Sequence, residues 1–158
     1  MSVINATSEQ IRALLQNASI EMTCKDTEFL AEAATLVPKG TDIFIALFPN
    51  QTWDDLTGAA KAVQEAGFNA VPHVPCRRIK DAAEVAEIAR KLTQVAGATK
   101  MLLIAGDMPK PEGAFDSTIG VLETGHLAKA GIKTFYMAGH PEGFADTCEH
   151  SRPPIAGR

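Results

Sequence analysis

Acidic and imidazole side chains lie in or directly after four of the apolar segments of this sequence. Glu21 lies in the first segment, His73 near the end of the third, Asp107 after the fourth, and His140 with Glu142 after the fifth. Carboxylates and imidazoles can transfer protons and orient polar ligands. Because ligands of parallel sheets bind at the carboxyl ends of the strands, we expect these side chains to share one rim and one polar ligand.

Each of these residues also has a purely structural interpretation. Asp107 can simply begin a Pro-Gly loop, since aspartate favours turns, and His140 before Pro141 can be a turn residue in the same way. His73 lies between two prolines and can bond to a backbone carbonyl in a tight corner. Glu21 is harder to explain structurally, because a carboxylate buried without a partner in an apolar strand costs several kcal/mol. We therefore expect Glu21 to face a partner, water or a ligand.

Other features narrow the function classes. Arg77, Arg78 and Lys80 follow the third segment, where they either meet a phosphate or, as we expect, form a solvated loop. The net charge of −4 argues against a nucleic-acid or anionic-membrane surface, and no run approaches the roughly 18 apolar residues of a membrane span. The sequence has no Walker loop, GxGxxG or GxSxG motif. The three cysteines are widely spaced, so we expect no metal site and a reducing, cytoplasmic setting.

Helices and strands alternate along the chain. Apolar stretches predict strands at 18–23, 42–48, 69–74, 100–106 and 133–139. Periodic stretches predict helices at 7–17, 26–37, 52–66, 81–95 and 117–130. Thr7 with Gln10 has the spacing of a capping box. We expect Pro72 and Pro75 to end or bend the third strand.

This alternation predicts a parallel α/β sheet, for which two architectures are open. Glycines recur about every 30 residues before an apolar stretch, as expected of repeated βα units; they are Gly40, Gly67, Gly97 and Gly131. One architecture is a flavodoxin-like open sheet of five strands, which 158 residues can complete. The other is a (β/α)8 barrel of the TIM-barrel type, which needs about 250 residues. Length alone favours the open sheet.

Four motifs, in their order and spacing, resemble the methylenetetrahydrofolate reductase family. They are SIEMTCK (19–25), AVPHVPC (70–76), LLIAGDMP (102–109) and MAGHPEGF (137–144). Members of that family carry a glutamate in an S-x-E-x-x-P-like first strand and a P-H-x-x-C third strand. They also carry a G-D-x-P loop after the fourth strand and a P-E-G/V-H-P turn after the fifth. The similarity covers about residues 18–146.

The resemblance implies a (β/α)8 barrel that holds FAD across the carboxyl ends of its strands. It implies hydride transfer from NADH or NADPH to the flavin and on to 5,10-methylenetetrahydrofolate, a step of one-carbon metabolism that feeds methionine biosynthesis. Glu21 matches the family's general acid, which also faces the folate. Asp107, with Ala105 and Gly106 in its loop, matches the carboxylate near the flavin and the folate pterin. His73 matches a flavin contact, and His140 sits where many members have a tyrosine beside the flavin.

The sequence also departs from the family pattern. Ala105 replaces an arginine that contacts the flavin, and Thr23-Cys24 replaces a proline pair. Only about the first five βα units of the barrel are expected, as one domain over 1–158 with a helix in 1–17 and an irregular tail over 147–158. A homo-oligomer or a complementary chain would then supply the missing strands. The alternatives are a non-catalytic flavin- or folate-binding or assembly module, and a small flavodoxin-like metabolite-binding protein.

Overall fold

Five parallel strands form the sheet, one for each strand predicted from the sequence. The computed structural model describes residues 7–16 and 18–138. The strands are β1 (Ile20–Thr23), β2 (Asp42–Ala46), β3 (Asn69–Pro75), β4 (Lys100–Ile104) and β5 (Thr134–Met137). They lie in the order β1-β2-β3-β4-β5, and every neighbouring pair is parallel. The predicted α/β class with a parallel sheet is confirmed.

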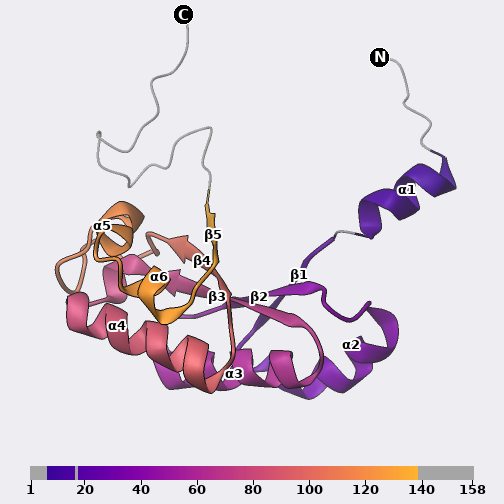
Figure 1. Ribbon diagram of the computed structural model, residues 1–158, viewed down its shortest axis with the longest axis horizontal. Helices are drawn as coiled ribbons and strands as arrows, with labels where there is room; N and C mark the ends of the chain where they lie inside the picture. The colour runs from indigo at the N-terminus through magenta and orange to yellow at the C-terminus, as the bar shows by residue number, and fades with distance from the viewer. Residues whose placement is uncertain (1–6, 17, 139–158) are drawn as a thin grey trace, which may run out of the picture.

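The strand order contradicts the flavodoxin-like alternative. A flavodoxin-like sheet has the order 2-1-3-4-5 and carries helices on both faces. Here each strand pairs with the next one along the chain, so every β-α-β connection advances in the same direction across the sheet. Because such connections are right-handed, each connecting helix lies on the same side of the sheet. Figure 1 shows α2, α3 and α4 along one side of the sheet. Within the described residues the sheet is open, with β1 and β5 at its two edges.

The helices follow the predicted ranges with one exception. They are α1 (Ser8–Leu15), α2 (Leu30–Leu36), α3 (Trp53–Glu65), α4 (Ala82–Arg90), α5 (Thr118–Glu123) and α6 (His126–Ala130). A 3-10 turn at Asp26–Phe29 precedes α2, and a π-helical turn at Lys91–Val95 continues α4. The single helix predicted over 117–130 is wrong. It is divided at Gly125, whose φ of 67° lies in the left-handed region that interrupts a helix.

Side-chain caps mark the beginnings of α1 and α3. The capping box predicted at Thr7 and Gln10 is confirmed, since the Thr7 hydroxyl accepts from the Gln10 N–H and the Gln10 side chain accepts from the Thr7 N–H. Thr52 forms a second box with Asp55 at the start of α3. Helix α1 buries none of its residues and lies apart from the sheet in Figure 1. Its cap therefore stabilises it without help from core packing.

The apolar core lies between the sheet and its helices. Burial alternates along β2 and β4, and the residues that point to the helices are at most 1 % exposed; they are Ile43, Ile45, Met101 and Leu103. Helices α3 and α4 complete this layer with the fully buried Leu56, Ala60, Val63, Val85 and Ala89. Burying one large aliphatic side chain contributes about 1.5–3 kcal/mol, so this layer is the main stabilising element.

Strand β3 ends at Pro75, one of the two prolines expected to end or bend it, but it does not end at Pro72. The strand runs through Pro72 and reaches Pro75. Pairing with β2 ends at Ile45–Pro72, and pairing with β4 begins at His73–Leu102. The missing N–H of a proline therefore falls where β3 changes partner, and the fixed φ of proline is compatible with extended backbone.

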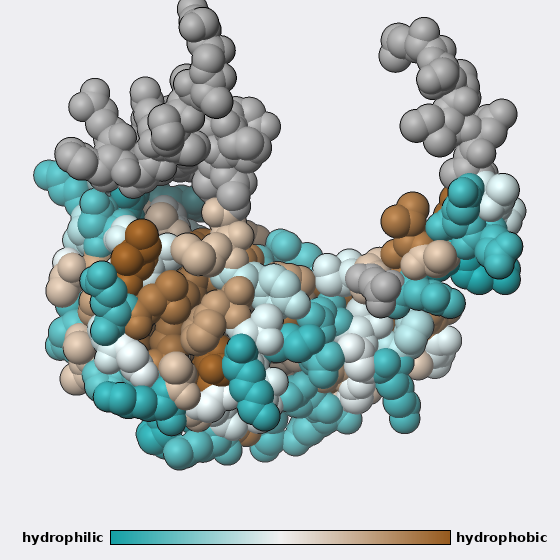
Figure 2. All heavy atoms as spheres, turned by 45° about the horizontal axis from the view of Figure 1, so that its top comes forward, coloured by the Kyte–Doolittle hydropathy of each residue, from teal (hydrophilic) through white to brown (hydrophobic). Residues whose placement is uncertain are grey.

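The second face of the sheet is not covered by any of the described helices. Alternate residues of β2 and β4 point to this open face and are only half-buried. Figure 2 shows apolar side chains gathered on the side of the molecule where α5, α6 and β5 lie. Exposed Ile119 of α5 and Met137 of β5 belong to this part of the chain.

Candidate functional site

The strand register places two of the predicted site residues on the open face. Glu21 pairs with Phe44, and Phe44 pairs with Val71, so these three side chains point to the same side. His73 lies two positions after Val71 in the same strand and therefore also points to that side. The ring centroids of Phe44 and His73 are 5.9 Å apart in an edge-to-face arrangement. Glu21 and His73 thus share one surface around the Phe44 ring.

His73 is buried even though it points to the open face. Only 9 % of the residue is exposed, and its Nε2 has no hydrogen-bond partner among the described residues. Burial lowers the pKa of His73 below its usual value, and the negative charge of Glu21 opposes this in part. The imidazole is therefore neutral at pH 7. A buried ring nitrogen without a partner costs free energy that a hydrogen-bonding ligand would recover.

Glu21 faces water, one of the three environments expected for it. Strand β1 is an edge strand that pairs only with β2 in the described part of the chain, and its first two residues are exposed. The cost of burying an unpaired carboxylate therefore does not arise for Glu21. What remains is its position on the open face, where its charge acts on His73.

Asp107 lies in the loop from β4 to α5, and it is exposed. This loop is held close to the end of β3. Gly106 has a φ of 91°, and a Cβ at this position would lie 2.9 Å from the Cβ of Pro75. Gly113 lies so close to Lys80 that a Cβ there would overlap the Lys80 backbone. Only glycine fits these two positions, so the loop has a defined path around Asp107.

The predicted site residues therefore fall into two groups. Glu21 and His73 lie together on the open face, whereas Ala105, Gly106 and Asp107 lie in the loop beyond β4. His73 Nε2 has no partner among the described residues, so it makes no hydrogen bond to the carboxylate of Asp107. His140 and Glu142 lie outside the described residues.

Arg77 is not part of a solvated basic loop, contrary to the prediction. Its side chain is only 9 % exposed. Its Nε donates to the carboxylate of Asp116 at 3.0 Å, and its Nη1 donates to the carbonyl of Met108 at 3.0 Å. Its backbone N–H donates to the carbonyl of Ala105 at 3.1 Å, and its own carbonyl accepts from the Glu112 N–H at 2.7 Å. Arg77 thus binds the β4–α5 loop along most of its length.

Arg78 makes the corresponding contacts with the loop that follows β2. Its guanidinium donates to the carbonyl of Phe48 at 3.1 Å and to that of Gln51 at 2.7 Å. It also lies over the ring of Trp53, 5.4 Å from the centroid. Both arginines are therefore occupied by backbone carbonyls of neighbouring loops. The phosphate-binding role considered for them is not supported, and Lys80 is the exposed residue of the three.

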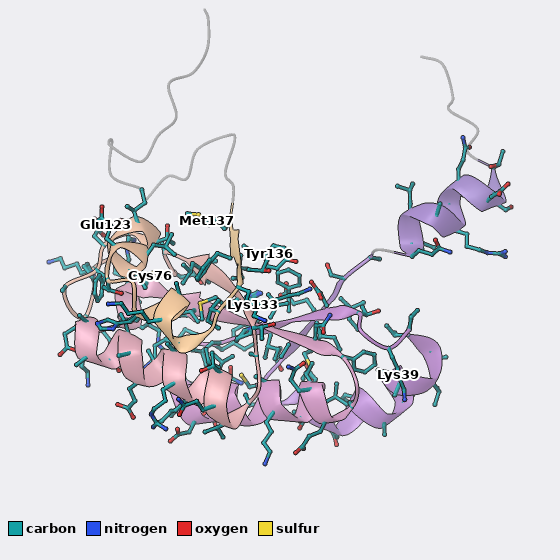
Figure 3. All side chains as sticks on the ribbon, viewed as in Figure 1. Lys39, Cys76, Glu123, Lys133, Tyr136 and Met137 are labelled. Carbon is teal, nitrogen blue, oxygen red and sulfur yellow. The ribbon has the colours of Figure 1, made fainter. Side chains whose placement is uncertain are left out.

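A polar cluster on the open face was not predicted from the sequence. Asp42 of β2 accepts hydrogen bonds from Lys100 of β4 at 2.7 and 2.9 Å, from Asn69 of β3 at 2.9 Å and from Tyr136 of β5 at 2.9 Å. Burial opposes the charge of Asp42, but these three donors outweigh it and hold its pKa below the usual value. Figure 3 shows Tyr136 projecting from β5. The available signal was that Asp42, Asn69 and Lys100 each begin a predicted apolar strand or directly precede it.

A hollow of about 430 Å³ adjoins this polar cluster. Its lining includes Asp42, Phe44, Lys100 and Tyr136, together with residues that precede β1 and β2. It therefore lies toward the amino-terminal end of the sheet. Glu21, His73 and Asp107 do not line it, so the hollow and the predicted site residues are separate features.

The two cysteines of the described ranges, Cys24 and Cys76, have packing roles. Cys76 belongs to the apolar core, and burial raises the pKa of its thiol to about 12. Burial is also the main cause that raises the pKa of Cys24 to about 11. In residues 7–16 and 18–138 no three His, Cys, Asp or Glu side chains gather closely enough to hold a metal ion.

None of the helices in the described ranges is both long and apolar enough to cross a membrane. The site that emerges is an open sheet face with Glu21 and His73, bordered by loops that Arg77 and Arg78 fix in place. No protein-family model matches the chain.

Proposed function

We propose that the chain is a flavin-binding oxidoreductase module of the methylenetetrahydrofolate reductase type. The observation that carries the proposal is the orphaned, buried Nε2 of His73 on the open sheet face, next to Glu21. A flavin is a planar, largely apolar ring system with polar edges. The ring of Phe44 and the hydrogen-bonding edge of His73 fit such a group.

The same proposal includes the fold, which would be part of a (β/α)8 barrel. Sequential parallel pairing with all helices on one side is the arrangement of a (β/α)8 barrel opened along one seam. In a closed barrel the open face would become the interior, and the β4–α5 loop would stand at the ligand-binding rim. Further strands, from a complementary chain or another copy, would pair with the free edges of β1 and β5.

Each residue has a distinct task in the proposed reaction. The bound FAD supplies hydride transfer between NADH or NADPH and 5,10-methylenetetrahydrofolate. His73 is neutral at pH 7 and provides a hydrogen bond to the flavin edge. Glu21, which matches the general acid of the family, would supply a proton to the folate nitrogen when its ring opens. Asp107 orients the pterin through its two carboxylate oxygens, in a loop where Ala105 and Gly106 approach the cofactor by backbone alone. His140 adds a flavin contact after β5, and the setting is cytoplasmic.

The test begins with the purified chain, to which FAD is added. We expect the protein to show visible flavin absorbance. When the FAD concentration is 100 times the dissociation constant, the free energy of unfolding should rise by about 2.7 kcal/mol. For a chain of this size that amounts to a rise of about 5–10 °C in Tm. His73→Ala should weaken FAD binding about tenfold. His126→Ala, at the start of α6, is the matched control that leaves the affinity unchanged.

The role of Glu21 needs a separate variant. Glu21→Gln should lower folate turnover by about 10²–10⁴-fold while FAD affinity survives, as expected for the loss of a proton donor. Glu28→Gln, in the exposed turn before α2, is the control for charge. A protein that contains no flavin and gains no thermal stability from added FAD would refute the proposal.

A second candidate is a non-catalytic flavin- or folate-binding or assembly module. The exposure of Glu21 favours this candidate, because a general acid works best where water is excluded. The edges of β1 and β5, which have no partner strand among the described residues, favour an assembly role. Nicotinamide-dependent reduction of bound flavin by this chain alone would rule the second candidate out.

A further inference from the structure

Arg77 contacts the β4–α5 loop with both its side chain and its backbone. It lies directly after β3, in the short 3-10 turn Cys76–Arg78. The contacts described above join it to Ala105, Met108, Glu112 and Asp116. Asp107 lies between the first two of these positions, so it is flanked by a contact with the Arg77 backbone N–H at Ala105 and a contact with the Arg77 guanidinium at Met108.

The chemistry of Arg77 suits this task. A guanidinium is a rigid, planar fork that stays charged, and it can donate to several acceptors at once. Here Nε donates to the Asp116 carboxylate and Nη1 donates to the Met108 carbonyl, two acceptors that lie eight residues apart in the loop. A lysine offers one ammonium group on a flexible stem and cannot reproduce this fork. The buried position of the side chain also removes it from competition with water.

We infer that Arg77 is a positioning residue that holds the β4–α5 loop, and with it Asp107, at the rim of the site. The inference rests on the proposed function for the role of Asp107, but not for the fixation of the loop. Arg78 makes a parallel connection to the β2–α3 loop, which provides a neighbouring arginine with a different target.

The loop itself can be tested without any flavin. Glu112 lies between Met108 and Asp116, the two loop residues that the Arg77 guanidinium binds, so cleavage by a glutamate-specific protease after Glu112 reports on loop opening. In Arg77→Gln we expect this cleavage to accelerate about tenfold or more, because two charged donors are lost. Arg77→Lys should behave nearly as Arg77→Gln. Arg78→Gln should leave cleavage after Glu112 unchanged and instead speed hydrogen exchange in residues 47–52.

The consequence for Asp107 is tested in the FAD-loaded protein. Arg77→Gln and Asp107→Asn should each raise KM for the folate by a larger factor than they slow flavin reduction by the nicotinamide. If both changes act on the same group, the double variant should be no worse than the poorer single variant. A general loss of structure would instead slow flavin reduction by a similar factor and lower Tm.

The outcomes separate cleanly. Unchanged cleavage after Glu112 in Arg77→Gln would overturn the inference, whether or not the protein binds flavin. Faster cleavage with effects of Arg77→Gln and Asp107→Asn that multiply would also overturn it, because the loop would then be held without positioning Asp107. If the protein binds no flavin, the proposed function fails, and the protease experiment still decides whether Arg77 holds the loop.

Discussion

Replacing Lys100 by methionine tests whether the polar cluster on the open face stabilises the sheet. Lys100 and Asp42 form the shortest ion pair of the described residues, at 2.7 Å, and their side chains are 28 % and 17 % exposed. Exposed pairs contribute about 0.2–1 kcal/mol, and breaking a buried pair costs about 3–5 kcal/mol. The Lys100–Asp42 pair is of intermediate burial, and Asp42 has two further donors. Breaking the pair should therefore lower the free energy of unfolding by about 2 kcal/mol. At about 2–4 °C per kcal/mol, Tm should fall by about 4–8 °C.

The measurement is urea unfolding at pH 7, with Lys61→Met as the matched control. Lys61 pairs with Glu65 on the surface of α3 at 3.6 Å, and both side chains are more than half exposed. Its loss should cost about 0.3–0.5 kcal/mol. Asp42→Asn and the double variant complete a cycle, in which the coupling between Lys100 and Asp42 should exceed about 1 kcal/mol.

The pH dependence provides a second check on the same pair. Because the pKa of Asp42 is lowered in the folded protein, the unfolded chain binds more protons in acid. The contribution of Asp42 is therefore fully present above about pH 4 and is lost as the pH falls through the folded-state pKa. Equal losses for Lys100→Met and Lys61→Met, or additive effects in the cycle, would refute the reasoning.

Three further predictions concern the rest of the molecule. Gly113→Ala should destabilise the protein measurably in urea, because the new methyl group overlaps the backbone of Lys80. Gly58 lies inside α3 with free space around it, so Gly58→Ala should stabilise the protein by about 1 kcal/mol. Leu103→Ala should cost about 2–5 kcal/mol by calorimetry or urea unfolding, and Leu14→Ala on exposed α1 less than about 0.5 kcal/mol. Since the pKa of His73 is lowered in the folded state, its contribution is present above about pH 6.5 and declines in more acidic solution. Wild-type urea midpoints should therefore fall more than those of His73→Gln between pH 8 and pH 5.5, and equal falls would contradict this.

The strands and most helix boundaries could be predicted because they depend on local pattern. Apolar stretches marked all five strands, and Thr7 with Gln10 marked a helix start. Gly125 was the exception, since its left-handed conformation divides a helix that periodicity alone continues. Pro75 ends β3 as expected, whereas Pro72 does not, because a missing N–H matters only where a partner needs it, and β3 changes partner after Pro72.

The candidate site was predictable only in part. The positions of Glu21 and His73 on one face follow from the period of two in a strand, once the register is known. The burial of Arg77 was not predictable, because a sequence rich in basic residues after a strand looks the same whether it faces water or a neighbouring loop. The role of Asp42 was missed for the same reason, since its three donors come from three other strands.

The sequence by itself determined that βα units repeat, because burial and backbone propensity act over a few residues. Only the tertiary structure decided the order of the strands, which excludes a doubly wound sheet and leaves one face of the sheet without a helix among the described residues. Only the tertiary structure decided which polar groups would find hydrogen-bond partners. Bonds such as those of Arg77 with Met108 and Asp116 join segments that are far apart in the chain. Long-range contacts of this kind depend on register and loop path, which no local pattern encodes.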